Sequence, residues 1–156
     1  MEIEIVWGSD EGTTPLGAFD AALADAGVHN YNHVRLSSVI PPDAAIVETG
    51  THDGQWDVGT IVASVLASNE SSTPGETIAA GLGWRRAEEG GIFFEGSGDS
   101  TDVVDSRVRR GIDSGTTHRP DWHWQDDIRT RVVDHTVERH GAVVVVALYR
   151  PLPPSP

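Results

Sequence analysis

One stretch near the C-terminus dominates the pattern of the chain: Gly141-Ala142-Val143-Val144-Val145-Val146-Ala147-Leu148-Tyr149. An uncharged, valine-rich run is typical of a strand covered on both faces, because a strand with one wet face alternates apolar and polar residues. Residues 127–138 also indicate a strand, and His140-Gly141 is suited to turn the chain. The sequence therefore predicts a hairpin of 127–138 and 141–149, with Val143–Leu148 almost fully buried.

Further strands are expected along most of the chain. Residues 28–39 are interpreted as one β segment that stops at Pro41-Pro42, because neither proline can donate to a strand ladder. The run 91–95 is short, apolar and preceded by glycine, which favours a buried strand. The remaining expected strands are 2–7, 44–48, 57–67 and 76–85.

Two segments carry helical signals. Thr14 is suited to the N-cap, Pro15 to the first helical position and Gly27 to the end of the helix. The apolar residues between them repeat at helical spacing: Leu16, Phe19, Leu23 and Ala26. The second expected helix covers 100–113, followed by a polar loop over 114–126.

Many strands with two helices favour an α+β fold, in which packed sheets are covered by helices. At 156 residues the length fits one domain. We assign this domain to residues 1–150 and treat 151–156 as a proline-rich tail.

Charge is the strongest compositional signal. The formal net charge is −13 with 24 acidic residues, and all eleven basic residues are arginine, so the chain has no lysine. Adaptation to a salt-rich cytoplasm, in which self-repulsion is screened, explains this best and is compatible with steering of a cationic substrate. Such acidity opposes binding to nucleic acid or to an anionic membrane.

Several classes are excluded by what the chain lacks. Without cysteine there is no disulfide framework and no cysteine nucleophile. Without lysine the chain cannot hold pyridoxal phosphate as a Schiff base, so a carbonyl electron sink must come from elsewhere. The start, 1–7, alternates like a strand and has no basic region of a signal peptide, and no apolar run is long enough for a membrane span, so a cytoplasmic protein is expected.

The segment Asn32-His33-Val34-Arg35-Leu36-Ser37-Ser38-Val39-Ile40-Pro41-Pro42 holds the candidate chemistry. Taken alone, a Ser-Ser pair before prolines is more often an ordinary strand edge. In its context, however, it resembles the self-cleavage segment of pyruvoyl-dependent arginine decarboxylases. Segments 14–23, 93–95 and 134–141 resemble the same family in the same order, and the likeness covers most of 2–150.

The resemblance implies an αββα sandwich that assembles into trimers, or into dimers of trimers, with active sites between subunits. It also implies self-cleavage between Ser37 and Ser38, which yields chains 1–37 and 38–156. Ser38 would become a covalent pyruvoyl group, with neither pyridoxal phosphate nor a metal. The likeness is weakest over about 99–126, so these residues have no implied role.

The implied reaction is that of a carboxy-lyase. The pyruvoyl carbonyl forms a Schiff base with L-arginine and withdraws electrons as CO₂ leaves, which produces agmatine, a precursor for polyamine biosynthesis. The same chemistry on another amino acid remains open. A relative that does not process itself and acts only as a binding or assembly subunit is the alternative from another class.

Asn32 matches a polar side chain that the family uses near the pyruvoyl group. In one extended strand it shares a face with Ser38, but six residues span roughly 20 Å, so a neighbouring subunit would have to bring the two together. The plain alternative is a turn asparagine, which suits both Asn30 and Asn32.

Asp20 borders the apolar stripe of the first helix. By pattern alone it is equally an edge residue reaching solvent and a carboxylate that needs a partner. The resemblance implies that it faces the substrate guanidinium, with Leu16 and Leu23 as apolar contacts. Bidentate carboxylate–guanidinium pairing would then select the substrate.

Glu95 follows the apolar run Ile92-Phe93-Phe94. A glutamate that leaves a buried strand more often simply reaches water, whereas the resemblance implies a catalytic glutamate. An apolar setting would raise its pKa and keep it able to deliver a proton.

Other motifs point to less. The glycines in 8–12 lack the Gly-Lys-Ser/Thr of a phosphate loop. The seven histidines form no His-Glu-x-x-His pattern, and His123 between two tryptophans is most simply a surface or packing feature. No Gly-x-Ser-x-Gly elbow supports a hydrolase triad around Ser37. We therefore expect no metal site.

Overall fold

The computed structural model describes residues 1–125 and 127–153, which form nine strands and two helices. The helices are α1 (Pro15–Asp25) and α2 (Thr101–Thr117). The strands are β1 (Glu2–Glu11), β2 (Asn32–Arg35), β3 (Val39–Ile40), β4 (Ala45–Gly50), β5 (Ile61–Ser71), β6 (Thr77–Ala87), β7 (Gly90–Gly98), β8 (Arg129–Thr136) and β9 (Gly141–Pro151). Within the described ranges, no helix is long and apolar enough to cross a membrane.

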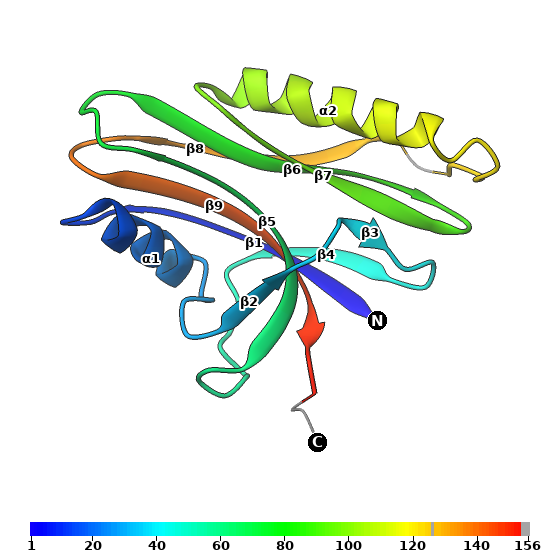
Figure 1. Ribbon diagram of the computed structural model, residues 1–156, viewed down its shortest axis with the longest axis horizontal. Helices are drawn as coiled ribbons and strands as arrows, with labels where there is room; N and C mark the ends of the chain where they lie inside the picture. The colour runs from blue at the N-terminus through cyan, green and yellow to red at the C-terminus, as the bar shows by residue number, and fades with distance from the viewer. Residues whose placement is uncertain (126, 154–156) are drawn as a thin grey trace.

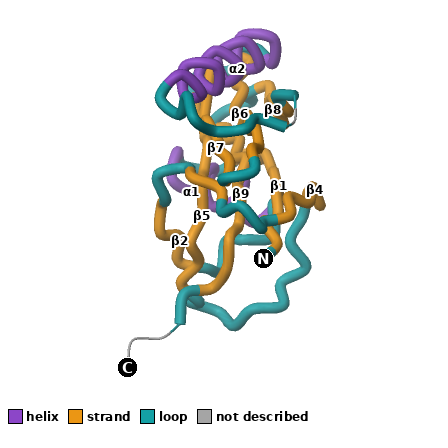
Figure 2. Tube along the Cα trace, turned by 90° about the vertical axis from the view of Figure 1, so that its right-hand side faces the viewer, coloured by secondary structure: helices purple, strands orange, loops and turns teal. Residues whose placement is uncertain are grey.

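The strands form two sheets that pack face to face. One has five strands in the order β2-β5-β9-β1-β4, and the other has four in the order β3-β7-β6-β8. The largest apolar cluster lies between the sheets, while α1 covers the outer face of the five-stranded sheet and α2 that of the four-stranded sheet (Figure 1). Figure 2 shows α2 outside β6, β7 and β8. The predicted α+β class, with packed sheets covered by helices, is confirmed.

The valine run forms β9, the central strand of the five-stranded sheet. Val143 and Val145 belong to the cluster between the sheets, and Val144 and Val146 to the cluster beneath α1. All four are fully buried, as expected for a strand covered on both faces.

The predicted hairpin of 127–138 and 141–149 is wrong. β8 pairs antiparallel with β6 in one sheet, whereas β9 pairs with β1 and β5 in the other. The turn is held by other partners: Val137 exchanges hydrogen bonds with the chain at Gly75 and Glu76, and the carboxylate of Glu11 accepts hydrogen bonds from the amides of Glu138 and Arg139. The chain therefore crosses from one sheet to the other at this turn.

The single β segment expected over 28–39 is also wrong, and the difference determines the site. β2 pairs parallel with β5 in the five-stranded sheet, whereas β3 pairs antiparallel with β7 in the four-stranded sheet. Residues 36–38 carry the chain between the two sheets. The break falls at Ser38, whose φ of +69° is incompatible with a continuous strand.

Helix α1 follows its capping signals. The Thr14 hydroxyl accepts a hydrogen bond from the Gly17 amide at 3.0 Å, Pro15 opens the helix, and Gly27 follows its end with a positive φ of 78°. These features anchor the helix over the five-stranded sheet.

Helix α2 runs to Thr117, beyond the predicted end at residue 113, so the first part of the predicted loop is helical. Two of its glycines face β7. A Cβ at Gly111 would clash with the Phe94 ring, and one at Gly115 would approach Ile92 closely, so both glycines let the helix lie against β7. Of the predicted tail 151–156, Pro151 ends β9 and 154–156 lie outside the described residues.

Candidate active site

Ser38 lies at the junction of the two sheets, hydrogen bonded on two sides by β7. The Phe93 amide donates to the Ser38 carbonyl at 2.8 Å, and the Ser38 hydroxyl donates to Glu95 Oε1 at 2.7 Å. Phe93 and Glu95 are two residues apart, so their side chains lie on the same face of β7. Phe93 fills the core between the sheets, while Glu95 is half-buried where β7 leaves it. The expected buried strand over 91–95 is buried at Ile92 and Phe93, but Phe94 is 41% exposed and β7 continues past Glu95 to Gly98.

The backbone at Ser38 is strained. Among the described residues it is the one non-glycine residue with a positive φ. A left-handed conformation costs an L-residue roughly 1–2 kcal/mol and persists where surrounding contacts impose it. Here those contacts include the Phe93 amide and the Glu95 carboxylate. The structure therefore combines a strained serine backbone with a hydroxyl that is oriented by a carboxylate.

Two cavities meet at this pair. Ser37 and Ser38 line one of about 230 Å³ together with Phe94, His118 and Arg119. Glu95 lines a second, of about 270 Å³, between β5 and β7, where Arg35 is the cationic group. The pair therefore has a cavity on each side, and the cavity on the serine side is also lined by the cationic side chain of Arg119.

Two contributors to this region were missed by sequence reasoning. His118 and Arg119 lie at the end of α2, in the segment where the family likeness is weakest, so no motif marked them. Arg119 donates to the Gly115 carbonyl at 3.0 Å and its guanidinium lies 5.3 Å from the centre of the Trp122 ring, which fixes its position beside the cavity.

Tyr149, the last residue of the quoted valine run, was also missed. Its hydroxyl donates to the Val39 carbonyl at 2.7 Å, directly after Ser38. Burial, and secondarily the charge of Glu95, raises the pKa of Tyr149, so the phenol stays protonated and remains a donor. Only its place at the end of a buried strand could have drawn attention to it.

The other predicted site residues lie on a different layer. Asp20 and Leu16 are exposed on α1, with Leu16 77% exposed, and Leu23 is buried beneath the helix. Asn32 is exposed at the start of β2 and donates to the Gly59 carbonyl at 3.0 Å. None of these four lines either cavity at the Ser38–Glu95 pair. One chain thus brings together Ser37, Ser38 and Glu95, but not the residues expected to bind substrate.

Two histidine clusters lie elsewhere. His52 is buried, its Nδ1 donates to the carboxylate of Glu4 at 2.8 Å, and its ring lies against that of Trp56, which indicates a packing role. Glu88, Glu89 and His123 gather three metal-ligand atoms within 4.8 Å of one another, all on exposed residues, and within this group the His123 ring already pairs with Glu89 at 2.5 Å. In the part of the chain that the structure describes, this exposed group is the one such candidate.

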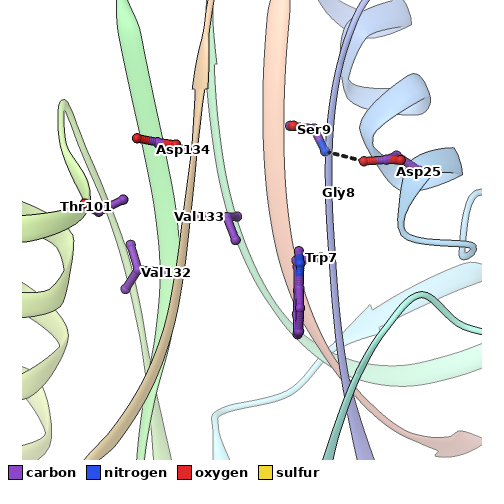
Figure 3. A pocket seen from close by; sticks show the side chains of 8 residues that line it. All are labelled: Trp7, Gly8, Ser9, Asp25, Thr101, Val132, Val133 and Asp134. Atoms are coloured by element: carbon purple, nitrogen blue, oxygen red, sulfur yellow. Dashed lines mark hydrogen bonds between the residues drawn. The ribbon is translucent and has the colours of Figure 1, made fainter.

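A further cavity of about 330 Å³ lies between β1, the end of α1 and β8 (Figure 3), and β8 is the edge of the four-stranded sheet opposite to β3. Trp7 lines it from β1 and Asp134 from β8, and Asp25 of α1 accepts a hydrogen bond from the Ser9 amide at 2.9 Å. It contains none of the predicted site residues, and its carboxylate at Asp25 is occupied by the backbone. The candidate site is therefore the one at Ser38.

The site thus consists of a two-sheet sandwich in which a serine with a positive φ, at the junction of the sheets, bonds to a glutamate of β7. The family model described as pyruvoyl-dependent arginine decarboxylase matches residues 2–152. The chain belongs to that family.

Curated relatives agree with this assignment. The pyruvoyl-dependent arginine decarboxylase of Halobacterium salinarum is 41% identical over 150 residues, which cover 94% of this chain and 92% of that protein. The one from Methanocaldococcus jannaschii is 35% identical over 150 residues, 93% of this chain and 87% of the relative. The one from Thermococcus kodakarensis is 40% identical over 112 residues, 70% of this chain and 69% of the relative.

Proposed function

We propose that this chain cleaves itself between Ser37 and Ser38 and then decarboxylates L-arginine to agmatine and CO₂. The observation that carries the proposal is the hydrogen bond of 2.7 Å between the Ser38 hydroxyl and Glu95 at a strained junction, in a chain of this family. The names of the relatives support arginine as the substrate.

Self-cleavage follows from the chemistry of serine. The Ser38 hydroxyl attacks the Ser37 carbonyl, the C–N bond breaks, and the nitrogen takes the proton, which converts the amide to an ester. Loss of the Ser38 α-proton and of the ester oxygen then releases residues 1–37 with a free carboxylate. The dehydroalanine left behind tautomerises and takes up water, which yields a pyruvoyl group and ammonia. No oxidant is required, because elimination and hydrolysis leave the electrons balanced.

Glu95 is placed to assist at the same atoms. In the precursor its carboxylate accepts the hydrogen bond of the Ser38 hydroxyl and so orients it. The pyruvoyl group supplies a carbonyl that binds the substrate amine and accepts electrons as CO₂ leaves. Glu95 remains beside that carbonyl and can deliver a proton to the former α-carbon. Ser38 thus fits the group that the family requires.

The substrate half of the site would come from another copy of the chain. Asp20, Leu16 and Asn32 are exposed at α1 and β2, and Leu23 would form the floor beneath them. A homotrimer, or a dimer of trimers, that places this surface against a neighbour's Ser38–Glu95 pair would complete the site. Further exposed apolar residues suit such an interface: Val34, Val39, Val58, Ile61 and Phe94.

The acidic surface supports a proposal that the enzyme works in high salt. At a net charge of −13 with no lysine, self-repulsion is screened only when salt is abundant. Activity and compactness should fall when molar salt is reduced to about 0.1 M, where the Debye length is roughly 10 Å. Equal stability at both salt concentrations would contradict this proposal.

A denaturing mass spectrum tests the function. The purified protein should give fragments 1–37 and 38–156, the latter blocked to N-terminal sequencing, and should release CO₂ from arginine. Ser38→Ala should remain one inactive chain. An active, uncleaved Ser38→Ala protein would overturn the proposal, an uncleaved wild-type chain would indicate an assembly subunit, and a preference for another amino acid in a substrate panel would replace arginine.

A further inference from the structure

Resting on the proposed self-cleavage, we propose that Tyr149 is a positioning residue for maturation. Its hydroxyl donates to the Val39 carbonyl at 2.7 Å, directly after Ser38 with its φ of +69°. This hydrogen bond would keep Ser38 in the backbone conformation from which its hydroxyl attacks the Ser37 carbonyl. Tyr149 acts through the backbone of its neighbours and takes no part in the bond changes.

Strand β3 needs contacts beyond its own strand pairing to fix its backbone. It consists of two residues, Val39 and Ile40, and pairs on one side with Ile92 and Gly91 of β7. Such a short edge strand cannot by itself impose a left-handed serine at its start. Tyr149 comes from β9 in the opposite sheet and reaches across the sandwich to the first carbonyl of β3.

Strand β9 has a bulge at Tyr149. Its pairing with β5 is regular up to Leu148, which faces Ser64, but Arg150 faces Ala63, so Tyr149 is an extra residue on its strand. A bulge of this kind bends a strand and re-aims a side chain, and bulges are frequent beside active sites. Here the bulge lies at the residue that bonds next to Ser38.

The surroundings of Tyr149 keep its hydroxyl protonated and its ring in place, so that it remains a hydrogen-bond donor. It is 8% exposed, its ring lies edge-on to Phe93 at a centroid distance of 6.2 Å, and Phe93 is the residue whose amide holds the Ser38 carbonyl. Burial raises the pKa of Tyr149, so it does not ionise near neutral pH. The two carbonyls that follow the scissile bond are therefore held from the two sheets, Ser38 by Phe93 and Val39 by Tyr149.

These hydrogen bonds restrict only one side of the scissile peptide. With the C-terminal side of the bond held, the Ser37 side faces the cavity that contains His118 and Arg119. Loss of the Tyr149 hydrogen bond should let Ser38 relax to an ordinary negative φ. This change should turn the Ser38 hydroxyl away from the Ser37 carbonyl. Attack should become slower, while the finished sandwich remains intact.

The experiment follows self-cleavage of newly made chains by pulse and chase in cell-free synthesis, with separation on denaturing gels. Tyr149→Phe keeps the ring and removes only the hydroxyl. We expect its cleavage rate to fall about tenfold, which corresponds to roughly 1.4 kcal/mol in the barrier. Hydroxylamine, which cuts esters but not amides, should release less of fragment 1–37 from the Tyr149→Phe precursor than from wild type.

Two controls separate positioning from general damage. Tyr31→Phe changes the other tyrosine of the chain, which packs against His52 and Trp56, and should cleave at the wild-type rate. Val144→Ala lowers stability from the same strand, on the face beneath α1, and should lower Tm without slowing cleavage.

The outcomes distinguish this inference from the proposed function. If wild type cleaves and Tyr149→Phe cleaves equally fast, or if Val144→Ala slows cleavage as much as Tyr149→Phe does, the role of Tyr149 is overturned. If wild type itself does not cleave, the proposed function fails first, and this inference with it.

Discussion

The two halves of the proposed site differ in how they are built. The half around Ser38 is complete within one chain: Glu95 bonds the serine hydroxyl and the Phe93 amide bonds its carbonyl. The half around Asp20 is open, because Asp20 and Leu16 project from α1 on the other outer layer of the sandwich. In Figure 1, α1 lies against the five-stranded sheet while Ser38 precedes β3 of the other sheet.

The residues that react and the residues that select the substrate need different surroundings. A self-cleaving serine must be positioned before any partner or substrate arrives, so its contacts are intramolecular. Substrate selection is needed only in the mature enzyme. The residues for it can therefore lie on an exposed surface that a neighbouring chain covers on assembly. Changes in the first half should therefore impair cleavage or turnover in the chain that carries them, and changes in the second half should impair substrate binding at a neighbour's Ser38–Glu95 pair.

The largest expected effect is at Glu95. Glutamine can still accept the hydrogen bond of Ser38 but cannot deliver a proton, so Glu95→Gln should self-cleave while its kcat falls by roughly 10²–10⁴. A hydrazine reagent should still detect the new carbonyl, and borohydride should still attach arginine to the 38–156 fragment. Agmatine formation at the normal rate would show that Glu95 is only a structural residue of β7.

A smaller effect is expected at Asp20. Asp20→Asn should cleave normally but raise KM for arginine roughly 10- to 100-fold, because a hydrogen bond to a charged group is worth about 1.5–3 kcal/mol. Asp25→Asn, on the same helix, is the control, because Asp25 accepts a backbone amide and lies outside the predicted site. An unchanged KM in Asp20→Asn would remove Asp20 from the substrate site.

Mixing two variant chains tests whether neighbouring subunits share one active site. Chains carrying Ser38→Ala and chains carrying Asp20→Asn each lack one half, and co-refolding them should restore wild-type affinity in about a quarter of the sites if neighbours share a site. If both halves came from one chain, the mixture would show no high-affinity activity. That outcome would contradict an interfacial site.

The smallest expected effect concerns the strand that carries Asn32. His33 bonds the Ser64 hydroxyl at 3.2 Å and the Val28 carbonyl at 3.1 Å, and its burial lowers its pKa. Because the unfolded chain then binds this proton more readily, stability should fall as pH drops below the unfolded value of about 6.5. Tm measured at pH 7.5 and pH 5.5 should fall less in His33→Gln than in wild type.

The exposed His29→Gln serves as the control for this measurement and should keep the wild-type response to pH. Identical pH responses of wild type and His33→Gln would mean that His33 does not couple the β2 region to pH.

Features carried by neighbouring residues were predictable from the sequence. The cap at Thr14, the stop at Gly27 and the burial of the valine run depend on local backbone preferences and on periodicity. The Ser37-Ser38 motif was likewise visible, because its family likeness depends on order and spacing along the chain. The same local signals failed at the end of α2, which runs to Thr117 with Gly111 and Gly115 against β7, because a glycine's neighbours across space do not show in a sequence pattern.

Only the tertiary structure decided which strands pair, and with that the site. Residues 28–39 have the composition of one strand, yet β5 pairs with their first part and β7 with their last, and Ser38 takes the strain between them. Tyr149 reaches Val39 across 110 positions of sequence. Strand pairing is a competition among distant segments for the same hydrogen bonds and the same apolar core, so its outcome depends on the whole chain, whereas periodicity reports only whether a segment can be buried.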